Sequence, residues 1–179
     1  MSRLVKALTQ VLAALRQHGV RHAAIGGLAV VAHGIVRATG DLDFLVDAAC
    51  AEPLRRAMSS LGFRCIYQSA DIANYVSHDL RVDFVLAHRP LALALLESPA
   101  RRSVFEHELP VVDVEGIVGL KLQAIANDAR RVQDLTDIRA LLSRHRETLD
   151  MGRLRVYFEL FDRLDLLDEL MRESQPHGT

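Results

Sequence analysis

The chain has 179 residues, half of them apolar, and its 22 Lys and Arg residues nearly balance 23 Asp and Glu residues. This composition suits one compact domain with a buried core. It excludes a strongly basic surface that binds nucleic acid nonspecifically, so any RNA contact must be local. The apolar runs are too short to cross a membrane, and two cysteines without CxxC spacing or a preceding secretory leader predict a cytoplasmic protein.

The first two thirds of the chain predict alternating helices and strands, because apolar residues change repeatedly between helical and strand spacing. The expected elements, in chain order, are an amphipathic helix ending near residue 19, a strand at 22–25, a short helix at 28–33, a strand at 41–46, a helix at 51–61, strands at 63–68, 74–78 and 81–87, a short helix at 91–97, and edge strands at 103–107 and 111–114.

From residue 115 onward the apolar residues keep helical spacing without strand signals. We therefore expect an α/β (α+β) protein, with a mixed β-sheet core flanked by helices over residues 1–114 and a C-terminal helical region over residues 115–179 packed on that core. Residues 174–179 are expected to fray. The apolar faces of the last helices belong to the core, to a homodimer interface or to a surface for a partner, and the sequence leaves these three open.

Two aspartates lie at the start of the strand at 41–46. Alternate side chains of a strand point to the same face, so Asp41 and Asp43 project together from Cα atoms roughly 6.6 Å apart. Asp83 alternates with apolar neighbours in the strand at 81–87. If the two strands are neighbours, the three carboxylates converge; the alternative for Asp83 is a salt bridge to a nearby arginine.

Three close carboxylates disfavour joint ionisation, and a divalent cation relieves their repulsion. Mg²⁺ binds through one or two carboxylates plus substrate phosphates, the arrangement that nucleotidyl transfer uses. Gly26 and Gly27 precede the aspartates, and the missing Cβ atoms allow phosphate oxygens to approach backbone N–H groups at the start of a helix. Alone, a Gly-Gly pair is usually a turn; together with the aspartates it predicts an NTP site with two Mg²⁺ ions, for which Mn²⁺ is a possible substitute.

The segments GGLAVVAHG (26–34), RATGDLDFLV (37–46) and VEGIVGLKLQAIANDARRVQDLTDIRALL (114–142) extend this pattern. The chain resembles the nucleotidyltransferase superfamily of the DNA polymerase beta-like fold, whose signature is Gly-Gly, a spacer, Asp-hydrophobic-Asp and a later acidic residue. Within that superfamily it is similar to the AbiEii-type toxins, over about residues 20–142. The residues that match the signature are Gly26, Gly27, Asp41, Asp43 and Asp83.

The resemblance implies that Asp41 and Asp43 bind metal and that Asp83 joins them and acts as general base on the acceptor hydroxyl. It also implies that Lys121 contacts the triphosphate and that Asp134 belongs to the nucleotide site. The alternative for Lys121 is a side chain that extends to solvent from an apolar helix.

The sequence itself predicts roles for three further polar side chains. Arg37 and Thr39 precede the first aspartates and can hold phosphate oxygens, or they are ordinary solvated loop residues. Asp137 is expected to cap a helix or to pair with Arg130 or Arg139 rather than to join the site.

We therefore expect a Mg²⁺-dependent enzyme that transfers a nucleoside monophosphate from an NTP to an acceptor hydroxyl. The resemblance alone implies the 3′ end of tRNA or another RNA as acceptor and a toxin neutralised by an antitoxin protein. One alternative is transfer to a small-molecule antibiotic or to a protein tyrosine, which the near-neutral charge suits. Another is a non-enzymatic nucleotide-binding pseudoenzyme that serves as an interaction module.

Overall fold

The computed structural model describes residues 2–173, and the residues expected to fray, 174–179, lie outside this range. The chain forms two compact units that divide between Val112 and Asp113. We call them the N-terminal unit and the C-terminal unit and describe each by itself. The sequence places the corresponding boundary after residue 114.

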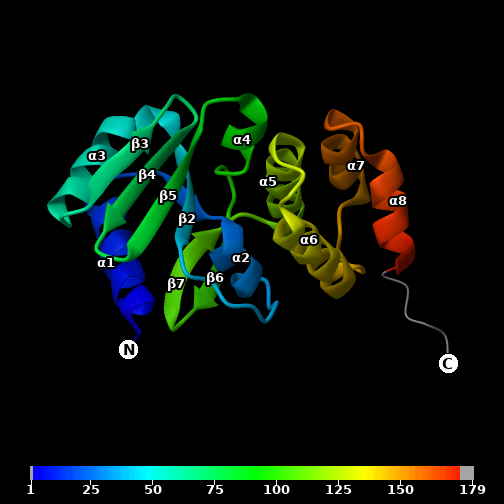
Figure 1. Ribbon diagram of the computed structural model, residues 1–179, viewed down its shortest axis with the longest axis horizontal. Coiled ribbons are helices and arrows are strands. Elements are labelled where there is room, and N and C mark those ends of the chain that lie inside the picture. The colour runs from blue at the N-terminus through cyan, green and yellow to red at the C-terminus, as the bar shows by residue number, and fades with distance from the viewer. Residues whose placement is uncertain (1, 174–179) are drawn as a thin grey trace. The chain divides into compact units, whose positions relative to one another are not determined.

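The N-terminal unit is built on a mixed sheet, as the sequence predicts (Figure 1). Its described residues form seven strands in the order β3-β4-β5-β2-β1-β7-β6. The strands are β1 (His22–Ala24), β2 (Leu42–Asp47), β3 (Arg64–Gln68), β4 (Ile72–Ser77), β5 (Leu80–Ala87), β6 (Ala100–Val104) and β7 (His107–Val111). The helices of this unit are α1 (Arg3–Gln17), α2 (Gly26–Ala32), the 3₁₀ turn η1 (Ala48–Cys50), α3 (Ala51–Ser60) and α4 (Pro90–Ala94).

The centre of the sheet is formed by β2 and β5, which run parallel to each other, with β1 and β4 antiparallel on either side. The Phe44 and Phe84 rings are fully buried and stack at 5.8 Å between centroids. Tyr75 of β4 packs edge-on against Phe84 at 5.7 Å. This aromatic contact fixes one face of β2 and β5 toward the core, so the residues that alternate with Phe44 and Phe84 must point to the opposite face.

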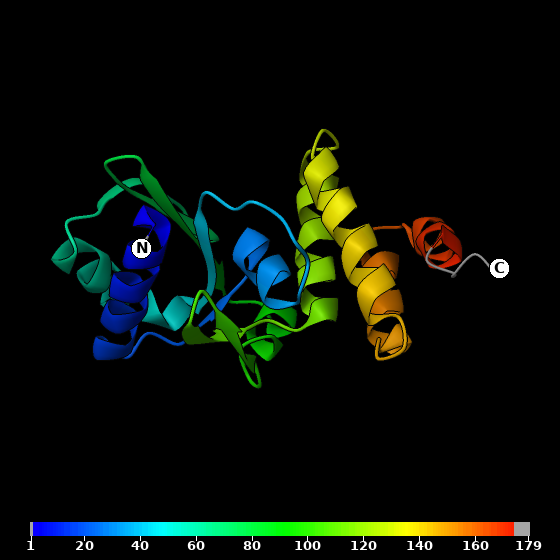
Figure 2. The same ribbon diagram turned by 90° about the horizontal axis from the view of Figure 1, so that it is seen from below.

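Helix α1 carries its apolar residues on one face, as the sequence predicts, and Leu8, Leu12 and Leu15 are buried. The Ser2 side chain accepts a hydrogen bond from the Val5 N–H and so caps the first turn. Gly19 follows the helix with φ +64°, a backbone conformation that ends a helix at low cost only for glycine. Helices α1 and α3 lie against each other in both views (Figure 2).

The strands expected at 103–107 and 111–114 are wrong in position. The structure has a hairpin of β6 and β7 whose turn falls at Phe105 and Glu106, with φ +50° and +68°. Phe105 is apolar but 41% exposed, so its hydrophobicity suggested a strand where the backbone reverses. Of these two strands β6 alone is an edge strand, because β7 pairs in parallel with β1.

The described part of the C-terminal unit is helical, as expected, and contains α5 (Val114–Asn127), α6 (Val132–His145), α7 (Met151–Leu160) and α8 (Leu164–Glu173). Asp113 caps α5 through the Gly116 N–H at 2.9 Å, and its carboxylate pairs with Arg153 of α7. Gly119 lets α5 approach α7 closely, since a Cβ there would lie 2.7 Å from Cδ1 of Tyr157. Nowhere in residues 2–173 does a helix combine the length and the apolar character needed to span a membrane.

Candidate active site

Asp43 and Asp83 are direct neighbours across the two central strands. The parallel pairing of β2 with β5 sets Asp43 opposite Asp83, and it sets Phe44 opposite Phe84. Since the phenylalanines face the core, both carboxylates project from the other face. The sequence predicts this common face, and the strand order supplies the neighbour relationship on which convergence depends.

Asp41 lies one residue before β2 begins and is exposed, so the strand starts one residue later than expected. Its charge nonetheless acts on the same region as those of Asp43 and Asp83, because all three raise the pKa of Arg81. The largest cause of that increase is the hydrogen bond from Arg81 to Asp83, followed by the charge of Asp83; partial burial opposes it, and Asp41 and Asp43 add smaller contributions.

Gly26 lies directly against Asp43. Its φ is +59°, and a Cβ built there would lie 2.2 Å from Oδ2 of Asp43. The Ile25 N–H donates to the Asp43 carbonyl at 3.0 Å and holds the two segments together. Helix α2 begins at Gly26, two residues earlier than predicted. Glycine is required at this position for two reasons: the backbone is left-handed, and the Asp43 carboxylate occupies the space that a side chain would need.

Gly27 is in similar contact with the loop before β2. A Cβ at Gly27 would lie 2.7 Å from Oγ1 of Thr39 and 3.3 Å from Cζ of Arg37. The Thr39 hydroxyl donates to the Asp41 carbonyl at 3.2 Å, and Arg37 Nε donates to the Ala38 carbonyl at 3.0 Å. Five of the predicted residues, two glycines, an arginine, a threonine and Asp43, therefore meet at the bend between β1 and α2.

Arg81 is a residue that the sequence interpretation did not place in the site. Its Nε donates to Asp83 Oδ1 at 2.8 Å and Oδ2 at 2.7 Å. This is the arginine salt bridge that the sequence leaves open as the alternative for Asp83. Asn74 of β4, which pairs with Asp83 in register, donates from Nδ2 to Asp83 Oδ1 at 2.6 Å. The Arg-x-Asp spacing puts both charges on one strand face and is the signal that identifies Arg81.

The carboxylates suit a hard divalent cation in their chemistry, since Mg²⁺ prefers oxygen ligands. As they stand in residues 2–173, however, no three His, Cys, Asp or Glu side chains form a group that could hold a metal ion. Asp83 is engaged by Arg81 and Asn74. In this arrangement Asp41 and Asp43 are the carboxylates whose chemistry suits such a cation, while Asp83 is paired with Arg81.

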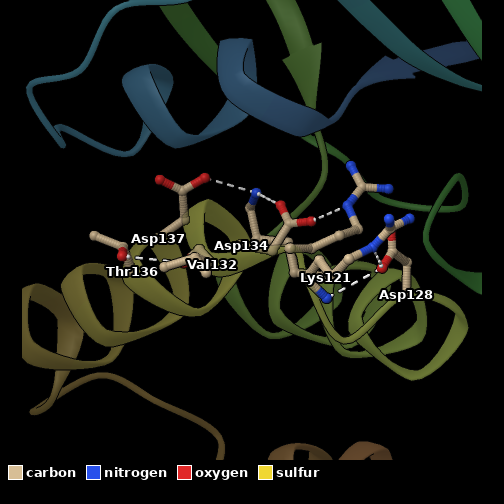
Figure 3. Close-up of polar contacts among 8 residues, drawn as sticks. Lys121, Asp128, Val132, Asp134, Thr136 and Asp137 are labelled. Carbon is tan, nitrogen blue, oxygen red and sulfur yellow. Dashed lines mark hydrogen bonds and ion pairs between the residues drawn. The ribbon is translucent and has the colours of Figure 1, made fainter.

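The C-terminal unit contains a buried ion cluster centred on Lys121 (Figure 3). Lys121 is 6% exposed, and its Nζ donates to Asp134 Oδ1 at 2.6 Å and to Asp137 Oδ2 at 2.7 Å. Arg131 Nε lies 2.6 Å from the other Asp134 oxygen. The Lys121 ammonium group thus binds two carboxylates of α6 and does not extend to solvent.

The sequence predicts that Asp137 caps a helix or pairs with Arg130 or Arg139, but in the structure it accepts a hydrogen bond from Lys121. It also accepts from Gln133 Nε2 at 2.9 Å. The arginines expected as its partners bind elsewhere, since Arg130 pairs with Asp128 and Arg139 with Glu173. The two acidic residues of α6 are one turn apart and face α5 together, so they form one cluster.

Comparison with known proteins places these features in a family. A sequence model described as "Nucleotidyl transferase AbiEii toxin, Type IV TA system" matches residues 11–177. The chain belongs to the AbiEii nucleotidyl transferase toxin family. It is therefore a nucleotidyltransferase, and the non-enzymatic alternative is set aside. No curated protein sequence matches the chain.

Solved structures share the AbiEii-family fold of this chain at low sequence identity. The antibiotic-resistance factor ANT(2″)-Ia in solution is 15% identical with a TM-score of 0.69, and the match covers 95% of this chain and 97% of that protein. The lincosamide antibiotic adenylyltransferase LnuA, with lincomycin bound, is 17% identical with a TM-score of 0.54 over 76% and 94% of the two chains. An antigenic nucleotidyltransferase-like protein from Paracoccidioides brasiliensis is 17% identical with a TM-score of 0.55, over 91% and 90%.

Proposed function

We propose that this nucleotidyltransferase is Mg²⁺-dependent and transfers a nucleoside monophosphate from an NTP to the 3′ end of RNA, with tRNA as the acceptor. The observation that carries the proposal is the pairing of Asp43 with Asp83 on one sheet face, beside the bend at Gly26. A passive scaffold has no need for two carboxylates in register or for a glycine that a carboxylate crowds.

Asp41, Asp43 and Asp83 are the residues that would hold the metal, as two Mg²⁺ ions or Mn²⁺ in their place. When bound, the metal lowers the pKa of the acceptor hydroxyl and neutralises charge on the phosphates. Asp43 is pre-positioned for this role, because Gly26 and the stacked phenylalanines fix its strand and its side chain. Asp41 is more exposed and supplies a second carboxylate from the loop.

Asp83 is the candidate general base. It would accept the proton of the acceptor hydroxyl while the hydroxyl oxygen forms a bond to the α-phosphorus of the NTP. The bond between that phosphorus and the bridging oxygen to the β-phosphate breaks, and pyrophosphate leaves with the electron pair. Asn74 keeps one Asp83 oxygen in place at 2.6 Å during this step.

The bend between β1 and α2 supplies the phosphate contacts in this proposal. The first N–H groups of a helix have no acceptor within the helix, and Gly26 and Gly27 leave room for phosphate oxygens beside them. Arg37 and Thr39, which lie against Gly27, add a charged and a hydroxyl donor. Lys121 gives two of its three N–H donors to Asp134 and Asp137; its contact with the triphosphate and the place of Asp134 in the nucleotide site are proposed from the family resemblance alone.

The acceptor is proposed from the family alone. The family description names a toxin of a toxin–antitoxin system, and transfer of a nucleotide to the 3′ end of tRNA would block aminoacylation and so inhibit growth. The same reasoning gives the chain an antitoxin protein as a partner. A homodimer formed through its apolar helix faces remains a prediction.

Incubation with labelled NTPs, Mg²⁺ and total tRNA tests the proposal directly. We expect label on tRNA with the wild type and at least about 100-fold less with Asp43→Ala, because a metal ligand is lost. Asp79→Ala is the matched control, since the Asp79 side chain is 88% exposed in a turn and pairs with Arg3. Label transfer by Asp43→Ala equal to that by Asp79→Ala would contradict the assignment of Asp43.

A second candidate acceptor is a small-molecule antibiotic. The similarity to ANT(2″)-Ia covers nearly the whole chain, and the net charge of −1 offers no general attraction to RNA. A mass increase of one nucleotide on an aminoglycoside or a lincosamide, with no label on tRNA, would favour this candidate. A mass increase on protein would point instead to tyrosine as the acceptor.

A further inference from the structure

Asp83 is held by two neighbours of different character. Asn74 faces it across the β4–β5 pair and donates to Oδ1 at 2.6 Å, while Arg81, two residues earlier in β5, contacts both oxygens at 2.8 and 2.7 Å. One carboxylate thus accepts three contacts from two side chains. Any cation or hydroxyl that uses Asp83 must share the carboxylate with these donors or displace one of them.

The two donors differ in how firmly they are held. Asn74 is 9% exposed, and its backbone lies in β4 between β3 and β5, so its side chain starts from a fixed position and has little room to move. The Arg81 side chain is 49% exposed. Ion pairs between partly exposed side chains contribute little, because water screens the charges and holding a long side chain costs entropy. Arg81 is therefore the donor that can leave.

The position of Arg81 matters for more than Asp83. The carboxylate that it contacts, Asp83, lies opposite Asp43 in the β2–β5 pair. Arg81 is thus a positive charge at one of the candidate metal ligands and on the strand next to a second. A cation bound by those carboxylates and a guanidinium at the same place would repel each other.

We propose that Arg81 is an internal counter-ion, which pairs with Asp83 in the metal-free enzyme and releases it when a divalent cation binds, whereas Asn74 stays and keeps Asp83 oriented. The inference rests on the proposed metal site. Its consequence is that the site stays folded and charge-compensated without metal and exposes Asp83 for catalysis only when metal arrives. Arg81 and Asn74 are positioning residues, since they act through Asp83.

Calorimetric titration with Mn²⁺ alone, at low ionic strength and without nucleotide, tests the counter-ion. We expect Arg81→Gln to bind Mn²⁺ about twofold to fivefold more tightly than the wild type, because the competing charge is gone. Arg81→Lys keeps a charge and is expected to bind as the wild type does. Arg101→Gln is the matched control, an exposed arginine of the edge strand β6, and is expected to change nothing.

Asn74→Ala separates the two roles. Loss of a residue that orients a metal ligand typically weakens metal binding 10-fold to 100-fold, so this variant is expected to bind more weakly while Arg81→Gln binds more tightly. Circular dichroism on each variant confirms folding, and Arg81→Met serves as a second charge-removing variant should the Gln variant fail to fold.

The titration distinguishes failure of the counter-ion proposal from failure of the proposed function. Absence of Mn²⁺ binding by the wild type would overturn the counter-ion, and label transfer to tRNA by the same preparation would leave the proposed function standing. Binding that is lost in Asp43→Asn but unchanged or weaker in both charge-removing Arg81 variants would overturn the counter-ion and leave the metal site standing. Equal tightening in Arg81→Lys and Arg81→Gln would also overturn it, since the effect would then not come from the charge.

Discussion

The Asp43 carboxylate lies against the Cα atom of Gly26, where a Cβ would meet Oδ2 at 2.2 Å. The contact joins the bend between β1 and α2 to the first residues of β2, two segments that are far apart in the chain. It leaves the carboxylate little freedom to turn away from the sheet face that it shares with Asp83. A glycine at this position is therefore part of the geometry of the site.

The first prediction concerns that glycine. Gly26→Ala adds both the strain of a left-handed alanine, about 1–2 kcal/mol, and the collision with Asp43, so we expect the free energy of unfolding to fall by at least about 3 kcal/mol. Nucleotide transfer should fall further than stability accounts for, because Asp43 must move. Urea unfolding and the transfer assay on the same samples measure the two effects.

Gly62 provides the matched control for this change. Its φ is +75°, but nothing lies within 4 Å of a Cβ built there. Gly62→Ala should lose only about 1–2 kcal/mol of stability and keep its transfer rate. Equal losses in the two variants would mean that the contact with Asp43 has no consequence.

The second prediction concerns the buried cluster of the C-terminal unit. Lys121→Met leaves Asp134 and Asp137 buried without their shared cation, so we expect a loss of about 3–5 kcal/mol in the free energy of unfolding. Lys6→Met, at an exposed position of α1, should change stability by less than about 0.5 kcal/mol.

Neutralising the whole cluster tests whether unpaired buried charge causes the loss of stability in Lys121→Met. The triple variant Lys121→Met, Asp134→Asn, Asp137→Asn has no unpaired buried charge and should be more stable than Lys121→Met alone, as chemical unfolding would show. A triple variant less stable than the single one would contradict this, and would show that the two carboxylates stabilise the unit through their other partners, Arg131 and Gln133.

The third prediction tests the approach of α5 to α7. Gly119→Ala would place a Cβ 2.7 Å from Cδ1 of Tyr157, and overpacking of this kind costs about 1–3 kcal/mol. Tyr157→Ala removes the obstacle, so the double variant should be more stable than the sum of the single changes predicts. Additive effects in a double-mutant cycle of thermal unfolding would contradict the contact.

The fourth prediction is a pH dependence of stability at His22. Burial is the main cause that lowers the pKa of His22 from its usual 6.5; the hydrogen bond to the Val20 carbonyl opposes this, and the charge of Arg16 adds to it. As the pH falls below about 6.5, the unfolded chain binds this proton more readily than the folded chain does. Stability is therefore lost from that pH downward, toward the lowered pKa of the folded state.

His22→Gln removes this titration, so the variant should lose less stability than the wild type between pH 7 and 5. Urea unfolding at several pH values measures the slope. If His22→Gln and the wild type have the same slope, other groups dominate the acid sensitivity.

Local sequence was enough to predict where the central strands lie and which way their aspartates point. Side-chain alternation in a strand depends only on the backbone, so Asp43 and Asp83 could be assigned a common orientation without knowledge of their neighbours. The same logic failed at the β6–β7 hairpin, because Phe105 is apolar yet occupies a turn with positive φ. The hydrophobicity of a residue indicates its preference for a buried position, but it does not indicate where the backbone turns.

The partners of Lys121 could not be predicted from the sequence. The helical spacing placed it in an apolar helix, but only the pairing of α5 with α6 shows that two carboxylates meet it there. Arg81 was likewise readable as a neighbour of Asp83 on one strand face, while its relation to Asp41 and Asp43 depends on β5 lying beside β2.

The sequence by itself determined the element types, the mixed α/β class and the candidate residues for a metal and phosphate site, because these follow from spacing and side-chain chemistry over a few residues. The tertiary structure alone decided which strands are neighbours, that Asp43 fills the space beside Gly26, and that Asn74 contacts Asp83 from the next strand. Those relations depend on contacts between segments distant in the chain, and no local preference of the backbone encodes them.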